Sequence, residues 1–308
     1  MTLKHQRPYV LIPPLMCCKR FSVIVSIMSM TGKKPIKIVV CKHWRYEYYL
    51  PSEPLKTNVT CYWRITSRGK FTSLHKTRFM PDGRMDLIFD INSSKLQNRI
   101  LLRGVMQKSF FMAREGKTEL LGVKFQPGGF YSLFKLSAHY FTGTLSPFNI
   151  ADANIARLFE QVFLGKNNQT RLRILEAALS RLVGNSKPVL EKVRLALEAI
   201  NNSKGEIRVC ELSKMLKISE NQLKLQFEKC IGTNTKSFSG VVRFLKAYGE
   251  VHNLFEKRML DVALDNGYYD QPHFVREFKK LYGLTPSQVH MRDWLQFLRT
   301  KMSHKSAH

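Results

Sequence analysis

Residues Gly267–Val289 read GYYDQPHFVREFKKLYGLTPSQV and contain a complete helix with its own start signals. Asp270 stands where a carboxylate can cap a helix N-terminus, and Pro272 fits the first turn, where its missing N–H costs nothing. Phe274 and Phe278 are four residues apart, so they share one face, which we expect to be core. The stretch therefore predicts a short amphipathic helix with one buried side and one basic side.

A second copy of this pattern lies about 50 residues upstream. Leu212–Gly232 (LSKMLKISENQLKLQFEKCIG) aligns with Val262–Gly283 when one gap is allowed, and Ser219 and Gln222 form a capping box in it. Each copy supplies a short helix, a tight turn and a capped second helix, which predicts two helix-turn-helix units. The equivalent positions are Leu212 and Val262, Ser213 and Ala263, Ile218 and Tyr268, Leu223 and Phe274, Phe227 and Phe278, and Gly232 and Gly283.

Residues 237–258 (SFSGVVRFLKAYGEVHNLFEKR) connect the two copies and predict one long amphipathic helix. Its expected core residues are Phe238, Val242, Leu245 and Leu254. A rigid connector would hold the second helices about one duplex turn apart, as successive major grooves of DNA require.

The outward side chains of the downstream copy suit base recognition. Arg276 can donate two hydrogen bonds to guanine, and Gln271 can pair similarly with adenine, with His273 one turn from Arg276. Lys279 and Lys280 near the helix end suit phosphate contacts. The alternative is an ordinary solvated helix face, but the repeat argues against it.

The upstream copy has a weaker set. Asn221 and Lys224 point outward, Lys229 suits a phosphate contact, and Leu225 occupies the position of Arg276. An apolar side chain there can touch only a thymine methyl group or a sugar. This helix is therefore either a weaker base reader, a phosphate clamp, or slightly rotated.

The first two thirds of the chain has a different pattern. Over residues 36–136, short runs rich in β-branched and aromatic residues alternate with turn signals, whereas residues 150–200 carry apolar residues at helical spacing. Residues 201–205 (NNSKG) resemble a linker. We expect an α+β protein. We expect an extension over 1–35 that is poorly ordered or precedes the true start, followed by a β-rich, barrel-like domain with helices over 36–200. An all-α domain over 201–300 then contains two helix-turn-helix units joined by a long helix. Residues 301–308 form a tail.

The charge balance is unusual, with 50 Lys and Arg against 23 Asp and Glu and a net charge of +27. Residues 201–308 contribute +7, which leaves +20 for residues 1–200. Such an excess favours polyanionic partners, either nucleic acid or an anionic membrane surface. Lys19 and Arg20 interrupt the apolar N-terminal run, so no stable membrane insertion is expected. The six cysteines lack C-x-x-C spacing and indicate reduced thiols in the cytoplasm.

The C-terminal hundred residues resemble the AraC/XylS family of bacterial transcription regulators. The similarity covers about residues 205–292 and is carried by ELSKMLKISENQLKLQF, VVRFLKA and, above all, NGYYDQPHFVREFKKLYGLTPSQ. It implies a nucleoid-associated cytoplasmic protein that binds double-stranded DNA. The reader positions that it implies are Asn221, Lys224 and Leu225 in the first helix, and Gln271, Pro272, His273 and Arg276 in the second. Leu225 and Lys217 depart from the family pattern, since polar residues and a turn glycine are usual there.

The segments YYLPSEPLKTNVTCYWRI, MPDGRMDLIFDI and GVKFQPGGFYSLF resemble a poorly characterised domain that often precedes this module. The resemblance implies that residues 36–200 sense an effector or dimerise. An unidentified small-molecule effector, RNA polymerase and a second copy of the chain are therefore further candidate partners. We expect Phe125, Phe130 and Tyr131 to be core residues rather than the lining of a pocket.

Two other functions stay open at this stage. A nonspecific DNA-binding or membrane-surface protein would explain the basic charge. A DNA-repair alkyl acceptor joined to this module would need an activated cysteine. Cys61 lies in a strand pattern, and no catalytic or metal-binding motif occurs. We therefore expect no enzyme activity, no cofactor and no metal site.

Overall fold

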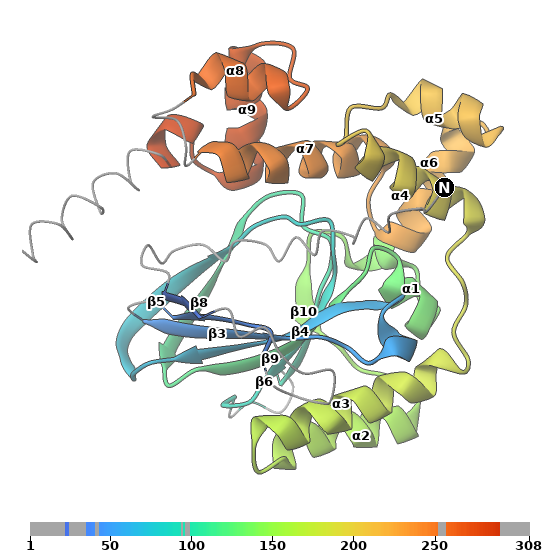
Figure 1. Cartoon of the computed structure of the whole chain (residues 1–308). Helices are drawn as coiled ribbons and strands as arrows, with labels where there is room; N and C mark the ends of the chain where they lie inside the picture. The colour runs from blue at the N-terminus through green and yellow to red at the C-terminus, as the bar shows by residue number, and fades with distance from the viewer. Residues whose placement is uncertain are drawn as a thin grey trace, which may run out of the picture.

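The computed structural model describes residues 22–24, 35–40, 43–93, 95, 99–251 and 257–289. The expected tail lies outside these residues, and so does the expected extension except for strand β1 (Ser22–Ile24) and Pro35. Figure 1 shows a β-rich body with a separate set of helices along its upper end. The expected α+β class, with strands first and helices last, is confirmed.

An eight-stranded antiparallel sheet forms the centre of the β-rich body. Its segments are rich in Val, Ile, Leu, Tyr and Trp, whose side chains pack well on a pleated surface. The order across the sheet is β1, β2 (Lys37–Val40), β3 (Trp44–Tyr49), β4 (Val59–Ser67), β9 (Glu119–Phe125), β6 (Asp86–Asp90), β7 (Ile100–Arg103) and β10 (Leu145–Pro147).

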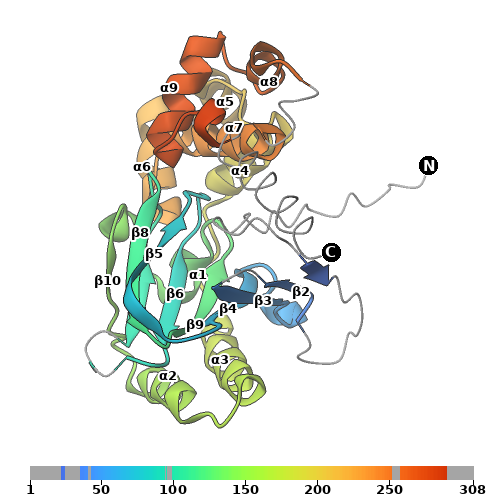
Figure 2. The same cartoon turned by 90° about the vertical axis from the view of Figure 1, so that its left-hand side faces the viewer.

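The two faces of this sheet are covered by different elements. On one face, Phe89 and Val123 belong to a core with helices α1 (Gly129–Phe134), α2 (Ala153–Leu164) and α3 (Asn168–Val183). On the other face, Trp63 and Ile88 lie under a pair of antiparallel strands, β5 (Phe71–Phe79) and β8 (Phe110–Gly116). Figures 1 and 2 place α2 and α3 at the end of the body that is opposite to the C-terminal helices.

A cluster of charged side chains is buried between these layers. Asp82 accepts from Lys124 Nζ at 2.5 Å, and Asp86 accepts from Arg103 Nε at 2.6 Å and from Trp63 Nε1 at 2.8 Å. Both carboxylates also lie 3.2 Å from the cation of the other pair. The cluster therefore combines two acids and two bases with no net charge, which is how charged groups become tolerable in a protein interior.

The C-terminal helices form two units on either side of a connecting helix. The first unit contains α5 (Val209–Leu216) and α6 (Glu220–Ile231), and the second contains α8 (Met259–Asp265) and α9 (Gln271–Tyr282). Helix α7 (Thr235–Val251) runs across the top of the β-rich body between them (Figure 1). The expected connector is therefore present, although residues 252–256 of the segment lie outside the described part of the chain.

Packing refines two details of the sequence analysis. Helix α4 (Glu191–Asn202), which lies on the N-terminal side of the boundary expected at residues 201–205, shares a core with α5 and α6. In α7 the fully buried face contains Val241 and Phe244, whereas Val242 and Leu245 are only half-buried. Phe238 is buried as expected, and the rest of the buried face differs because α7 packs on both helical units and on the β-rich body at once.

We expect Asp82→Asn to lower the free energy of unfolding by about 3–5 kcal/mol, because it leaves two buried cations with one carboxylate. Burial alone raises the pKa of Asp82, but Lys124, Arg103 and Arg84 outweigh it and lower that pKa well below its usual value. A depressed pKa means that the stabilisation is present above the unfolded pKa of about 3.9 and is lost as the pH falls further. Urea unfolding at neutral pH and at decreasing pH measures both effects. Glu160→Gln, at an exposed position on α2, is the control and should change stability little.

Candidate nucleic-acid interface

The two helical units have the same local architecture, as the repeat predicted. Leu223 and Phe227 of α6 are completely buried, and so are their counterparts Phe274 and Phe278 of α9. Gly232 and Gly283 end the two second helices in the left-handed conformation, with φ of 92° and 88°. Each second helix is therefore held by one apolar face and stopped by a glycine cap.

Side-chain caps begin both second helices. Ser219 accepts from Gln222 N at 3.2 Å while Gln222 Oε1 accepts from Ser219 N at 3.3 Å, which is the expected capping box. Asp270 Oδ1 accepts from His273 N at 2.6 Å, and Pro272 lies in the first turn of α9. These bonds satisfy backbone donors that have no partner inside the helix.

The turn before each second helix needs a left-handed residue. Gly267 supplies it in the second unit with φ of 71°, and Lys217 occupies the equivalent position in the first with φ of 52°. A residue with a Cβ atom is uncommon in this conformation. The departure of Lys217 from the usual glycine thus changes the strain of the turn without changing its shape.

The expected readers on α9 lie near its N-terminus. Gln271, Pro272 and Arg276 are exposed, and the side chains of Gln271 and Arg276 make no hydrogen bond or ion pair with the described residues. His273 is half-buried, and its ring packs edge-on against Tyr268 with the centroids 5.6 Å apart. The structure therefore brings Gln271 and Arg276 to an open face and leaves His273 partly covered.

The expected readers on α6 are also uncovered. Asn221 and Lys224 are exposed, and 58% of Leu225 is accessible. Helix α6 buries the predicted core pair, as α9 buries its own, so the two helices turn equivalent faces outward. The alternative of a helix rotated about its own axis is therefore not needed. A large exposed leucine beside a lysine is the main chemical difference between the two outward faces.

The three predicted phosphate contacts and one unpredicted residue complete the outward surface. Lys229, Lys279 and Lys280 are exposed in the last turns of α6 and α9, with Lys280 Nζ 3.6 Å from Glu277. Tyr269 precedes the α9 cap, is 88% exposed and was not singled out in the sequence. The adjacent Tyr268 is buried, so the pair Tyr268-Tyr269 places one ring in the core and one in solvent.

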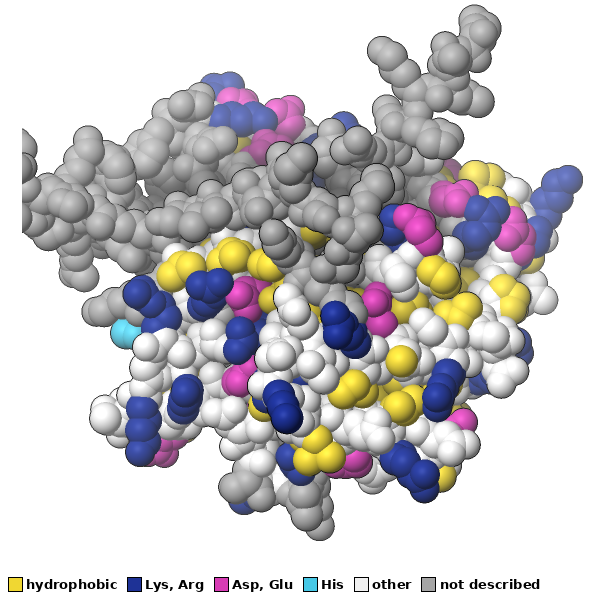
Figure 3. Space-filling model, turned by 60° about the horizontal axis from the view of Figure 1, so that its bottom comes forward, with side chains coloured by type: hydrophobic (Ala, Val, Ile, Leu, Met, Phe, Trp, Pro, Cys, Tyr) yellow, Lys and Arg dark blue, Asp and Glu magenta, His cyan; other side chains and the backbone are white. Residues whose placement is uncertain are grey.

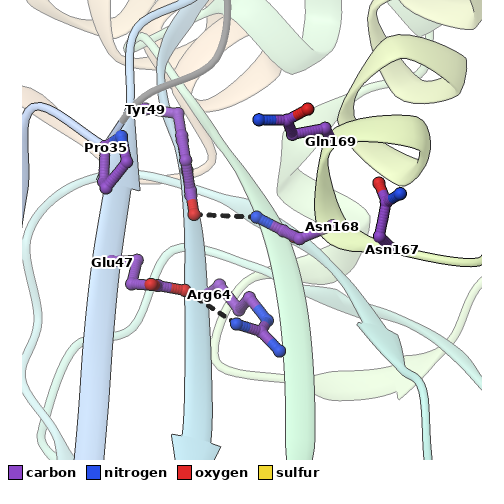
Figure 4. Close-up of a pocket in the computed structure, with 7 residues that line it drawn as sticks. All are labelled: Pro35, Glu47, Tyr49, Arg64, Asn167, Asn168 and Gln169. Carbon is purple, nitrogen blue, oxygen red and sulfur yellow. Dashed lines mark hydrogen bonds and ion pairs between the residues drawn. The ribbon is translucent and has the colours of Figure 1, made fainter.

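The β-rich domain has a shallow cleft of about 410 Å³ between the sheet and the start of α3 (Figure 4). Arg64 pairs in it with Glu47 at 2.8 Å, and Asn168 Nδ2 donates to Tyr49 Oη at 2.7 Å. Burial raises the pKa of Glu47, but its bonds to Arg64 and Arg45 lower it overall. Because the charged groups are already paired, the cleft offers neutral polar groups to a ligand. The residues that line it are Pro35, Glu47, Tyr49, Arg64, Asn167, Asn168 and Gln169.

The basic excess of the chain does not form one patch on the face shown in Figure 3. Where that face is coloured by type, Lys and Arg are scattered among acidic, apolar and uncharged side chains. The charge is therefore distributed over this face rather than concentrated in one basic patch.

No helix in the described ranges combines the length and apolar character needed to cross a membrane.

The thiol and metal chemistry of the described residues is limited. Burial raises the pKa of Cys61 to about 12, while Lys124 lowers it by less and Asp86 raises it further, so the thiol stays protonated at neutral pH. Cys230 is also buried, and burial raises its pKa. Within the part of the chain that the structure describes, no three His, Cys, Asp or Glu residues are grouped to hold a metal. Cys61 is thus a core residue rather than an activated nucleophile.

Comparison with known families assigns the two helical units. Residues 212–292, which begin within α5 and extend beyond the end of α9, match a family model described as a helix-turn-helix domain. The chain carries an AraC-type helix-turn-helix domain. Residues 47–147, upstream of the AraC-type domain, match a domain of unknown function, DUF6597. A DNA-binding transcription regulator is the class that this domain supports, and α6 and α9 are the second helices of its two helix-turn-helix units.

Solved structures with low overall similarity accompany this assignment. The C-terminal domain of the two-component response regulator YesN from Fusobacterium nucleatum is 26% identical, covers 32% of this chain and 95% of its own, and has a TM-score of 0.30. ToxT from Vibrio cholerae is 13% identical, covers 81% of this chain and 98% of its own, and has a TM-score of 0.37. No protein with a curated description matches the chain. At such TM-scores the assignment rests on the AraC-type domain match and not on the superpositions.

We expect Asp270→Ala to lower the free energy of unfolding by about 1 kcal/mol, because the N-cap acceptor of α9 is lost. Chemical denaturation of the full chain measures the change. Asp270→Asn keeps an acceptor oxygen at the same place and should retain most of the stability. Equal losses in both variants would show that the cap bond is not the source of the effect.

Proposed function

We propose that this protein is a sequence-specific transcription regulator that places α6 and α9 in successive major grooves of double-stranded DNA. The observation that supports the proposal is the pair of capped recognition helices whose polar side chains near the N-terminus are uncovered. Recognition helices of this class contact base edges with the residues near their N-termini. The connecting helix α7 joins the two within one domain, as binding on one side of the duplex requires.

The two helices are proposed to read DNA unequally. Arg276 and Gln271 of α9 offer bidentate donors for guanine and adenine. On α6, Asn221 and Lys224 flank an exposed Leu225, which is suited to a thymine methyl group or a sugar. The α9 half-site should therefore carry most of the sequence discrimination.

Backbone contacts would orient the protein on the duplex. Lys229, Lys279 and Lys280 are proposed to approach phosphates, and Tyr269 is placed beside the α9 N-terminus, where a tyrosine hydroxyl can also bind a phosphate. Such contacts add affinity without specifying a base. They also make binding weaken as salt increases.

The β-rich domain is proposed to sense a neutral polar effector in the cleft beside Arg64 and Asn168, or to dimerise. The support for a neutral effector is that the charged lining groups are already paired. Cytoplasmic, nucleoid-associated action and contact with RNA polymerase belong to the same proposal. Catalysis is not part of it, because Cys61 is buried and protonated.

Selection from randomised duplexes with the full chain should return a defined operator, which tests the proposal directly. We then expect Arg276→Ala to lose about 1–3 kcal/mol of discrimination at one base pair, since a bidentate contact has that value. Gel-shift or anisotropy titrations against every base at each position measure it.

Lys279→Ala is the control for a phosphate contact. It should weaken binding similarly for all sequences and reduce the salt dependence by about one ion. A wild-type protein that binds selected and scrambled duplexes equally, with a steep salt dependence, would instead favour a nonspecific DNA-binding protein.

A further inference from the structure

Both recognition helices are held at their C-terminal ends by the β-rich domain. The last carbonyls of a helix have no partner inside it and need donors from elsewhere. At the end of α9, Leu281 O accepts from Ser109 N at 2.7 Å and from Ser109 Oγ at 3.0 Å. Tyr282 O accepts from Arg78 Nη1 at 2.9 Å. Two residues of the β-rich domain therefore cap the second recognition helix.

Arg78 supplies the charged donor among these contacts. Its guanidinium lies 4.5 Å from the ring centre of Tyr282 and 4.8 Å from that of Phe111, so it is held between the two domains. A cation at a helix C-terminus also interacts favourably with the helix dipole. Met80, just after β5, packs in the same apolar cluster as Leu281 and Tyr282.

An equivalent contact occurs at the end of α6. Thr142 Oγ1 donates to Gly232 O, the carbonyl of the residue that ends this helix. A methyl group at Gly232 would lie 3.1 Å from Ala138 O, which shows how closely the backbones approach. Tyr131 of α1 is part of the core of the first unit, together with Phe227.

The two units are thus joined twice, by α7 on one side and by the β-rich domain on the other (Figures 1 and 2). Rotation of either unit about α7 would break the hydrogen bonds between the C-terminal end of its recognition helix and the β-rich domain. We propose that Arg78 and Ser109 at the end of α9, with Thr142 at the end of α6, are positioning residues of the β-rich domain that set the angle between the two recognition helices and hence the operator spacing that the protein accepts. This inference rests on the proposed DNA-binding function.

The inference predicts a dependence on spacing that stability alone would not produce. One added base pair rotates a half-site by about 34° around the duplex. A rigid pair of helices should reject such an operator, whereas a pair that rotates about α7 should tolerate it. Pre-organisation also raises the affinity for the matched spacing, because less freedom is lost on binding.

The experiment uses the full chain and the selected operator, with spacers between the two half-sites altered by one and two base pairs. Wild-type protein should prefer one spacing strongly. Arg78→Ala should bind the matched operator about tenfold more weakly, as loss of a charged hydrogen bond implies. Its preference for that spacing should fall by a similar factor. The nearly isosteric Thr142→Val should act in the same direction, and the affinity for each isolated half-site should stay within about twofold.

Conservative variants and one distant variant are the controls. Thr142→Ser keeps the hydroxyl donor and Arg78→Lys keeps a cation, so both should recover much of the wild-type spacing profile. Arg173→Ala removes an exposed arginine on α3 and should leave the profile unchanged. An unaltered profile in Arg78→Ala and Thr142→Val, or an equal loss on isolated half-sites, would overturn the positioning role. A wild-type protein without any selected operator would instead contradict the proposed function.

Discussion

A recognition helix can be held only on surfaces that the DNA does not need. In this protein the side of each proposed recognition helix packs on its own unit through a pair of buried residues, such as Phe274 and Phe278 in α9. The C-terminal end of each helix contacts the β-rich domain. The last carbonyls of a helix have no partner inside it and need donors from elsewhere. Arg78, Ser109 and Thr142 supply those donors. Gln271 and Arg276 of α9 stay exposed because the rest of the chain supports this helix from its side and from its C-terminal end.

This arrangement connects the interior of the β-rich domain to the helices through one short loop. Asp82 belongs to the buried charge cluster, while Met80 in the same loop packs among residues of α7 and α9. Gly83, with φ of 68°, lets the loop approach α7 so closely that a methyl group there would lie 2.7 Å from the Phe238 ring. The buried ion pairs restrain the loop, since moving Asp82 would leave Lys124 without its closest carboxylate. The core of one domain is therefore mechanically joined to the connector of the other.

Some features of this fold are encoded by neighbouring residues, and others depend on contacts between distant segments. The capping box at Ser219 and the Asp270 cap were both predicted correctly, because each depends on residues within a few positions of one another. The same holds for the strand-rich first region and the core assignment of Phe125 and Phe130. Periodicity did not separate Val241 from Val242 as the buried residue of α7. That choice depends on three neighbours that contact the helix from different directions.

The sequence by itself determined the two helix-turn-helix units, their caps and the outward side chains of α6 and α9. Helical spacing and terminal residues specify a helix and its polar face without reference to the rest of the chain. Only the tertiary structure showed that α4 packs with the C-terminal helices, that Tyr131 enters their core, and that Arg78 caps α9. Arg78 and Tyr282 are separated by 204 residues, and no local pattern encodes a hydrogen bond across that distance. Such contacts arise from the way in which two separately patterned domains fit together.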